Sequence, residues 1–308
     1  MIATTGFFDG VHLGHRLVIE RLVSLARERG DESLVVTFWP HPRAVLQDGA
    51  RELRLLTTLE EKKAILAGLG VSRVEVLDFS RPFASLSAEE YLRTVLRDRF
   101  GVTTLLVGYD NRLGSDRLTA ASLAPIAAAL GIELIELQPL SFRAEPKDTP
   151  LSFRAEPKAE SRNLEISSTK IRKSLEDGDI ASATAMLGYG YSLQGVVVAG
   201  NRLGRTIGFP TANMKLYEPL KLVPGRGVYV VEADVLGQKY RGMTNIGTRP
   251  TVGGSTTTIE THILDFDEDI YGLPLRITFL RRLRDEIHFP SLDALKAQLS
   301  LDRAACRG

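Results

Sequence analysis

The chain has 308 residues, 44% hydrophobic and 25% charged, which is typical of a globular protein and long enough for two domains. Lysine plus arginine number 39 and aspartate plus glutamate 38, so the net charge of +1 predicts no overall attraction to nucleic acid or membrane. No stretch reaches the roughly 20 apolar residues of a membrane helix, and no signal peptide is visible. The single cysteine, Cys306, cannot form an intrachain disulfide, which favours a cytoplasmic location.

The first 140 residues alternate short apolar runs with longer amphipathic segments. This alternation predicts strands and helices in turn, an order typical of a doubly wound α/β domain with a parallel sheet covered on both faces. Strands are expected at 2–6, 34–38, 74–77 and 104–107, and helices at 15–29, 58–69, 88–99 and 123–130.

A polar, proline-containing segment follows from Gln138 to Glu165 and contains a tandem repeat. The residues from Leu140 to Lys147 recur letter for letter from Leu151 to Lys158. Repeat architectures need at least about three units to bury a core, so two copies predict a duplicated surface loop. A functional lid is the alternative.

The remainder of the chain changes from helical to strand-like character. Helices are expected at 169–176 and 180–187, strands at 196–198, 227–231, 240–244, 257–266 and 275–280, and a closing helix at 292–299. Short strands separated by Gly, Pro and Asn turns are typical of a small antiparallel β-barrel or sandwich. The predicted domains are therefore 1–187 and 188–308.

Two histidines follow the first predicted strand, in the segment from Thr5 to His15. His12 and His15 are three residues apart, so a helical turn points both rings to one side. Gly10 and Gly14 let a polyphosphate approach the backbone, and a helix start supplies free N–H groups. This pattern predicts a phosphate cradle, while a capped helix start with two surface histidines fits the spacing equally well.

A second polar segment, Ile166 to Arg172, presents hydroxyl groups at another predicted helix start. Ser168 or Thr169 fits a simple helix cap. Arg172 favours an anion-binding role, because a cation in the first turn opposes the helix dipole unless an anion lies beside it.

A third segment, from Gly200 to Asn213, is a glycine-rich loop without a Walker pattern. It offers backbone freedom, a cation, a hydroxyl and an amide oxygen, which together suit a nucleotide with Mg²⁺. The residues concerned are Gly204, Arg205, Gly208, Thr211 and Asn213. A plain glycine-rich turn is the alternative for this loop alone.

The N-terminal motifs resemble the HxGH nucleotidylyltransferases, and specifically the FMN adenylyltransferase module of bacterial bifunctional riboflavin kinase/FAD synthetases. The matching stretches are Gly6 to His15, Thr37 to Pro42, Leu56 to Lys63 and Ile166 to Arg172. The likeness spans residues 2 to 188.

The resemblance implies attack of the FMN phosphate on the α-phosphorus of ATP, with pyrophosphate released and no covalent enzyme intermediate. It implies that His12 and His15 donate to the phosphates, that Gly10, Gly14, Ser168 and Thr169 hold them and that Arg172 neutralises them. It also places Asp110 and Asn111 at the flavin. The chain reads Asp-Asn-Arg-Leu-Gly from Asp110 to Gly114, where the family has Asp-Phe-Arg-Phe-Gly.

Five further stretches match, in order, the riboflavin kinase domain of the same enzymes, over residues 188 to 299. They are Pro224 to Tyr229, Asn245 to Thr251, Glu260 to Phe266, Ile270 to Gly272 and Leu283 to Phe289. By this resemblance, Glu260 is the general base that takes the proton of the riboflavin 5′-hydroxyl as ATP donates its γ-phosphoryl group. By itself, an alternating strand equally fits an exposed, inert Glu260.

The same resemblance assigns the other predicted residues of the C-terminal domain. Gly204, Arg205 and Gly208 bind the nucleotide, Thr211 and Asn213 the Mg²⁺ ion, and Arg284 and Glu286 the flavin. The expected protein makes FMN from riboflavin and then FAD from FMN, using ATP and Mg²⁺ at both steps. Two alternatives stay open: a kinase with an impaired N-terminal module, and a flavin- or nucleotide-binding regulator without turnover. The sequence gives no prediction about the oligomeric state or about channelling of FMN between the two sites.

Overall fold

The computed structural model describes residues 1–46, 53–108, 111–137, 141–142, 155–156, 166–200, 203–251 and 254–307. The chain divides into two compact units, Met1–Ser168 and Thr169–Gly308. Within the described residues, no helix has both the length and the apolar character to cross a membrane.

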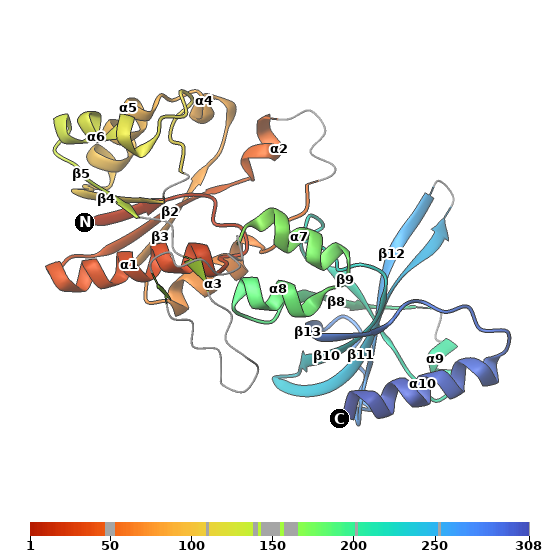
Figure 1. Ribbon diagram of the computed structural model, residues 1–308. Coiled ribbons are helices and arrows are strands. Elements are labelled where there is room, and N and C mark those ends of the chain that lie inside the picture. Colours follow the sequence, from red (N-terminus) through yellow and green to blue (C-terminus); the bar gives the residue numbers. More distant parts are fainter. Residues whose placement is uncertain are drawn as a thin grey trace. The chain divides into compact units, whose positions relative to one another are not determined.

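The first unit is built on a five-stranded parallel sheet in the order β3-β2-β1-β4-β5 (Figure 1). The strands are β1 (Ile2–Thr5), β2 (Ser33–Trp39), β3 (Arg73–Asp78), β4 (Thr104–Gly108) and β5 (Glu133–Leu137). The strand order reverses at β1, so the loop after β1 lies at the switch point where such sheets bind ligands. The predicted doubly wound parallel sheet is confirmed.

Helices connect these strands and cover the sheet. They are α1 (Leu13–Arg29), α2 (Pro42–Leu46), α3 (Leu59–Gly68), α4 (Arg81–Ala84), α5 (Ala88–Glu90), the π-helix η2 (Tyr91–Arg99) and α6 (Ala120–Ala129). The helix predicted at 88–99 is therefore one turn of α-helix that continues as a wider π-helix. Helix α1 ends at Gly30, whose φ of 64° lies in the left-handed region that glycine adopts without strain.

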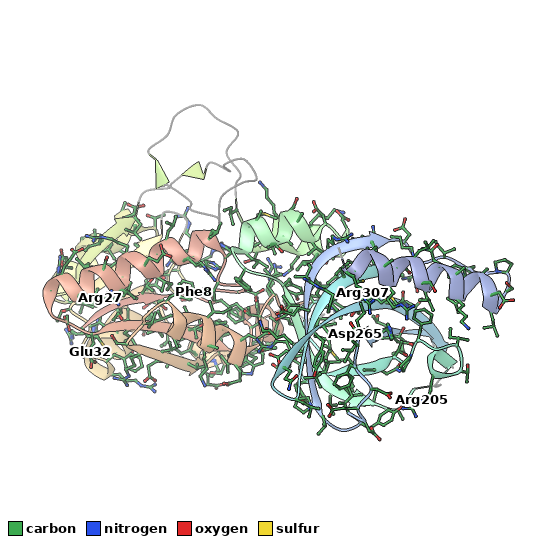
Figure 2. The ribbon with its side chains drawn as sticks, turned by 90° about the horizontal axis from the view of Figure 1, so that it is seen from below. Phe8, Arg27, Glu32, Arg205, Asp265 and Arg307 are labelled. Atoms are coloured by element: carbon green, nitrogen blue, oxygen red, sulfur yellow. The ribbon has the colours of Figure 1, made fainter. Side chains whose placement is uncertain are left out.

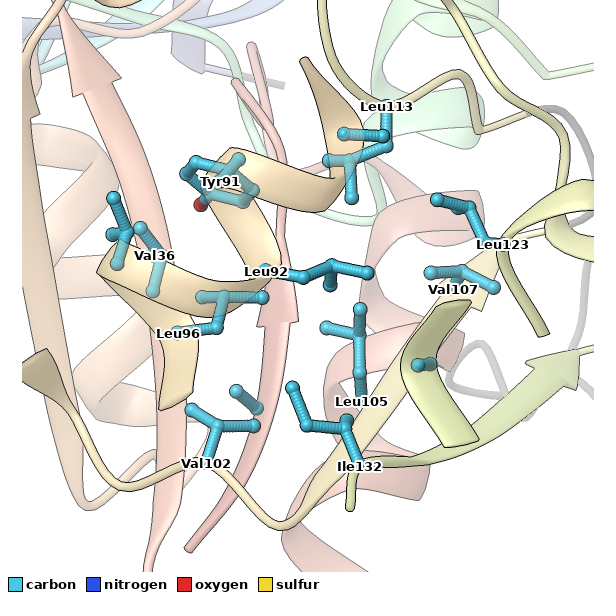
Figure 3. Close-up of a cluster of buried hydrophobic side chains, with 14 of the residues drawn as sticks. Val36, Tyr91, Leu92, Leu96, Val102, Leu105, Val107, Leu113, Leu123 and Ile132 are labelled. Atoms are coloured by element: carbon cyan, nitrogen blue, oxygen red, sulfur yellow. The ribbon is translucent and has the colours of Figure 1, made fainter. Parts of the chain in front are cut away.

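Both faces of the sheet are buried, because successive residues of each strand point to opposite sides. Ile2, Val35 and Leu106 pack with α1 on one face. The other face packs against η2 and α6, and Figure 3 shows this cluster with Val36, Leu92, Leu96, Leu105, Val107, Leu123 and Ile132. Replacing one such leucine by alanine costs about 2–5 kcal/mol, so this core fixes the sheet that carries the first site.

The second unit contains a closed barrel in the order β10-β11-β12-β9-β8-β13, with antiparallel pairing throughout. Its strands are β8 (Ser192–Val198), β9 (Ala212–Leu216), β10 (Gly227–Val235), β11 (Gln238–Thr251), β12 (Gly254–Ile263) and β13 (Pro274–Arg284). A short helix α9 (Leu203–Thr206) precedes β9, and α10 (Leu292–Arg307) closes the chain. The predicted small antiparallel barrel is confirmed.

Two helices connect to the barrel, α7 (Ser168–Glu176) and α8 (Ile180–Leu187). Helix α8 packs against β13, and a Cβ atom at Gly225 would lie 2.2 Å from the carbonyl oxygen of Glu176. Packing therefore groups nearly all of both helices with the barrel, whereas the domain border predicted from the sequence falls after them, at 187/188.

The predicted elements differ from the observed ones in number and in length. Strands β5 and β9 and the short helices α2, α4 and α9 are absent from the prediction, and α10 runs eight residues beyond the predicted end at Leu299. Most of the duplicated segment lies outside the described residues. Its described parts, β6 (Ser141–Phe142) and β7 (Ala155–Glu156), pair antiparallel.

Candidate active sites

The loop between β1 and α1 carries both histidines of the HLGH segment. His12 is the N-cap residue of α1, and its Nδ1 accepts a hydrogen bond of 3.3 Å from the backbone N–H of His15. The two rings stack, with centroids 3.6 Å apart and an angle of 16° between their planes. A Cβ atom at Gly14 would lie 3.3 Å from the His12 ring, so glycine leaves room for this stack. Both rings thus lie on one side of the helix start, as their spacing predicts.

A buried carboxylate holds the same loop in place. Asp9 is 4% exposed, and its Oδ1 accepts hydrogen bonds from the backbone N–H groups of Leu56 at 3.0 Å and Thr57 at 3.2 Å. The Gly10 N–H in turn donates to Thr57 Oγ1 at 3.1 Å. Gly10 has a φ of 81°, a conformation that glycine adopts without strain. Residues before α3 therefore fix the loop that precedes the histidines.

A buried lysine supports the loop from α3. Lys62 is 1% exposed, and its Nζ donates to the carbonyl oxygen of Phe7 at 2.6 Å and to Thr37 Oγ1 at 3.3 Å. The same ammonium group lies 3.7 Å from the centroid of the Phe7 ring. Sequence reasoning named neither Asp9 nor Lys62 as a site residue, because a charged residue in a loop or on a helix is ordinarily exposed.

Burial shifts the protonation of two basic groups at this loop. The pKa of His15 is well below its ordinary value, chiefly through burial and further through nearby His12 and Lys62. Burial lowers the pKa of Lys62 to about 8, although Asp9 opposes the shift. Within the described residues, the buried Nδ1 atom of His15 has no hydrogen-bond partner. A polyanion at this loop would favour the charged forms of both groups.

Of the predicted Ile166 to Arg172 residues, Ser168 lies at the histidine loop. Its hydroxyl donates to the Asp9 carbonyl oxygen at 3.0 Å, and Ser168 is the first residue of α7 rather than its cap. Thr169 and Arg172 belong to the second unit. That they bind the same phosphates as the two histidines therefore stays a prediction.

An aromatic cavity of about 460 Å³ lies in the first unit, at the carboxyl end of β1. Asn111 lines it and donates from Nδ2 to the Thr5 carbonyl oxygen at 3.4 Å, whereas Asp110 lies outside the described residues. Five aromatic rings that were not predicted as site residues also line it: Phe7, Phe38, Phe79, Phe83 and Tyr91. The cavity suits a flat, largely apolar ring system.

In the second unit, strand register places several predicted residues in one row. Asn213 of β9 pairs with Glu260 of β12, and Glu260 pairs with Asn245 of β11. The row continues through Val228 of β10 to Arg284 of β13. Residues directly opposite in neighbouring strands share a face, so this row crosses the barrel on one face.

That face forms one wall of a cavity of about 290 Å³. Glu260 lines the cavity together with four other predicted residues, Gly204, Thr211, Arg284 and Glu286, and with Asn245, which was not predicted. The apolar part of the lining includes Val228, Met243, Ile287, Phe289 and Leu299. Asn213 belongs to the row but does not line this cavity; its side-chain amide lies against Gly200, where a Cβ atom would be 2.3 Å from Asn213 Nδ2.

Arg284 also lines this cavity, but its guanidinium group is engaged by α10. Nε and Nη2 donate to the buried Asp302 carboxylate at 3.1 and 2.7 Å, and Gln298 donates to the same carboxylate at 2.9 Å. Arg307 near the end of α10 pairs with Asp265 at 2.6 Å (Figure 2). These ion pairs fix α10 beside the cavity, a role for Arg284 that the sequence did not predict.

A smaller cavity of about 70 Å³ adjoins the first, because Thr211 lines both. Arg205, labelled in Figure 2, belongs to the smaller one, as do Ile270 and Tyr271. Gly208 has a φ of 83°, which turns the chain between Arg205 and Thr211. Gly204, Arg205, Thr211, Glu260, Arg284 and Glu286 therefore line two adjacent cavities with Thr211 in both, whereas Gly208 and Asn213 line neither.

Comparison with known proteins assigns both units. A family model described as FAD synthetase matches residues 1–147, and one described as riboflavin kinase matches residues 187–308. The bifunctional riboflavin kinase/FMN adenylyltransferase of Escherichia coli (strain K12) is 36% identical, covering 99% of this chain and 91% of that protein. The enzyme of the same name from Pseudomonas fluorescens is 38% identical, covering 99% and 92%.

Two further comparisons extend this result. The bifunctional riboflavin kinase/FMN adenylyltransferase of Bacillus subtilis (strain 168) is 33% identical, covering 98% of this chain and 90% of that protein. A crystal structure described as a macrolide-efflux protein from Streptococcus pneumoniae has a TM-score of 0.87 and 32% identity, covering 100% of this chain and 93% of that one. The chain therefore belongs to the bifunctional riboflavin kinase/FMN adenylyltransferase family and carries both an FAD synthetase domain and a riboflavin kinase domain.

Proposed function

We propose that this chain transfers the γ-phosphoryl group of ATP to riboflavin and then the adenylyl group of a second ATP to the FMN formed. The observation that carries the proposal is the placement of Glu260 and Thr211. Both line the larger barrel cavity, and Thr211 also borders the smaller one that contains Arg205. A carboxylate and a phosphate-binding loop are thus held next to one another, as phosphoryl transfer requires.

In the proposed kinase step, riboflavin occupies the larger cavity, and the phosphates of ATP lie at the smaller one. The apolar lining holds the flavin ring, and Glu260 accepts the proton of the ribityl 5′-hydroxyl as its oxygen attacks the γ-phosphorus. Arg205 offsets phosphate charge from the side of the smaller cavity. The protein forms no covalent bond to the substrates. It contributes by positioning them and by stabilising the charge of the transition state.

The donor set of this site fits Mg²⁺. The Thr211 hydroxyl and the Asn213 amide oxygen are hard oxygen donors, and Mg²⁺ takes one or two protein oxygens with the rest from phosphate and water. Within the described residues, no group of three or more His, Cys, Asp or Glu side chains is arranged for a metal. When bound there, Mg²⁺ supplies charge neutralisation of the phosphates, and the two side chains orient it.

In the proposed adenylyl transfer, the phosphates of ATP lie at the start of α1. His12 and His15 donate hydrogen bonds as negative charge develops on the α-phosphate, and the backbone N–H groups of the helix start add to this. Ser168, whose hydroxyl lies at this loop, adds a hydrogen-bonding group for the same phosphates. Asn111 and the aromatic cavity bind the flavin ring of FMN.

One specific observation bears on the alternative function, a riboflavin kinase with an impaired N-terminal module. Asn111 and Leu113 stand where the family has phenylalanines, and Leu113 is 8% exposed within the core. The cavity nevertheless keeps an aromatic wall from Phe38, Phe79, Phe83 and Tyr91. We therefore favour an active adenylyltransferase.

Incubating the pure protein with riboflavin, ATP and Mg²⁺, and separating FMN from FAD, tests the proposal. FMN followed by FAD is expected. FMN alone would support the rival with an impaired module. Neither product, from a protein that binds flavin or nucleotide, would support a regulator without turnover.

A cytoplasmic location and a functional domain border at 187/188 belong to the same proposal. The riboflavin kinase model begins at 187, which supports that border. The packing of α8 on β13 suggests a sharper test. Residues 188–308 and 169–308, expressed separately, are both expected to make FMN, and the longer fragment is expected to be the more stable. A folded 188–308 without kinase activity would move the border upstream.

A further inference from the structure

The pairing of β9 with β12 carries one of the two proposed metal ligands and ends next to the other. Asn213 pairs with Glu260, and Ala212 with Thr261. Thr211 directly precedes β9, and His262 directly follows Thr261 in β12. Glu260 and His262 are alternate residues of β12 and therefore share a face. Thr211, His262 and Glu260 all line the larger cavity.

The side chain of His262 in β12 contacts the segment that precedes β9. Its Nδ1 lies 2.8 Å from the carbonyl oxygen of Pro210, and because a carbonyl oxygen only accepts, Nδ1 is the donor. The imidazole also packs against the Phe209 ring, with centroids 5.3 Å apart. One buried side chain therefore contacts both residues that precede Thr211.

The turn that leads to Thr211 is a small, self-contained structure. Its described backbone hydrogen bonds run from Ile207 and Phe209 to Gly204 and from Gly208 to Arg205, all within the turn. Gly204 lies so close beneath Phe209 that a Cβ atom would be 2.2 Å from its carbonyl oxygen. The turn is thus held together by its own backbone, while the Phe209 ring in the barrel core and the His262 hydrogen bond to Pro210 hold it against the barrel.

We infer that His262 is a positioning residue of the kinase site, whose hydrogen bond to Pro210 holds Thr211 where the phosphates and metal of ATP bind. This inference rests on the proposed kinase function. Without the bond, the turn loses its hydrogen bond to β12 beside the catalytic carboxylate. Binding of ATP with Mg²⁺ then weakens, while Glu260 and the apolar flavin wall keep their places.

Two variants separate the hydrogen bond from the packing of the ring. His262→Asn keeps an N–H donor at the position of Nδ1, whereas His262→Leu has none, and both lose the ring contact with Phe209. We expect His262→Leu to raise the KM for ATP in FMN formation by about 3- to 10-fold, the scale of one hydrogen bond. We expect His262→Asn to stay near the wild-type value, and the KM for riboflavin to change little in either variant.

The same preparations supply the controls. FAD formation from added FMN reports on the other unit, and thermal unfolding reports on the barrel; if His262→Leu does not fold, His262→Ala replaces it. Equal KM values for ATP in the leucine and asparagine variants would overturn the inference, as would a rise confined to the KM for riboflavin. A wild-type protein that makes no FMN would instead contradict the proposed function on which the inference rests.

Discussion

The two units position their reactive side chains in different ways. In the first unit, the histidines follow a loop that groups distant in sequence hold in place: the backbone N–H groups of Leu56 and Thr57 bind Asp9 of the loop, and the Lys62 ammonium group binds its backbone. In the second unit, Glu260 and Asn213 lie on paired strands, so backbone register fixes them. A loop site thus depends on buried charges around it, whereas a strand site depends on the sheet itself.

This difference predicts which substitutions have effects beyond the side chain that is replaced. On the barrel, exchanging a side chain of the row leaves the ladder of backbone hydrogen bonds unchanged. Such a substitution should therefore change the reaction rate and leave the fold of the site intact. At the HLGH loop, exchanging a supporting charge changes both the stability and the geometry of the site.

The largest effect is expected for Glu260→Gln, which keeps the shape of the side chain and removes its basicity. The kinase rate should fall by about 10²- to 10⁴-fold, the usual contribution of a positioned proton acceptor. Glu232→Gln is a matched control, because Glu232 is a barrel carboxylate that pairs with Lys239 at 2.7 Å outside the cavity. Steady-state rates of FMN formation measure both; a normal turnover number with weaker binding would make Glu260 a substrate-positioning group.

The next effect is expected at the histidines. His15→Ala should lower FAD formation from FMN by about 10²-fold, the scale for losing one donor to a developing oxyanion, and leave FMN formation intact. His12→Ala also removes the N-cap of α1, which costs about 1 kcal/mol. His12→Asn restores a capping acceptor, so an adenylylation rate as low as that of His12→Ala would assign the loss to the imidazole. Full activity of the asparagine variant would reduce His12 to a helix cap.

A smaller effect, on stability, is expected for Lys62→Met. The pKa of Lys62 is lowered from 10.5 to about 8 by burial, so between these values the unfolded chain holds a proton that the folded chain has lost. Stability from this group therefore rises with pH across that window, by up to about 3 kcal/mol. Urea unfolding at pH 8 and near pH 10.5 should show that gain in the wild type relative to Lys62→Met.

Lys63→Met is the matched control for this measurement. Lys63 is exposed and pairs with Glu60 across one helical turn, so its replacement should leave the pH dependence of unfolding as in the wild type. Parallel pH dependence in all three proteins would contradict the burial of the Lys62 charge.

The smallest effect is expected from deleting Leu151 to Ser161, one period of the duplicated segment. Loop-closure entropy changes slowly with length, so the free energy of unfolding should change by less than about 1 kcal/mol, and both activities should survive. Urea unfolding and product assays check this. Selective loss of FAD synthesis would assign the segment to a lid over the adenylylation site.

Sequence patterns predicted the features that depend on neighbouring residues. Strand alternation placed Glu260 in a strand, and the three-residue spacing of His12 and His15 placed both rings on one side. Such features follow from local periodicity. The order of chemical motifs then identified the family before any packing was known.

Features that depend on distant residues were not predictable in the same way. Nothing in the sequence near Asn213 or Asn245 reveals that Glu260 lies between them, because register is set by pairing across the barrel. The burial of Lys62 and the engagement of Arg284 by Asp302 depend likewise on elements far apart along the chain. Helical periodicity treats such charged residues as surface positions.

The central claim is that two independent sites act in sequence in one chain. The most direct test incubates full-length His15→Ala and Glu260→Gln, separately and mixed, with riboflavin, ATP and Mg²⁺, and separates FMN from FAD. The histidine variant should stop at FMN, the glutamate variant should make almost no product from riboflavin, and the mixture should make FAD. No FAD from the mixture, or no FMN from the histidine variant alone, would contradict the account.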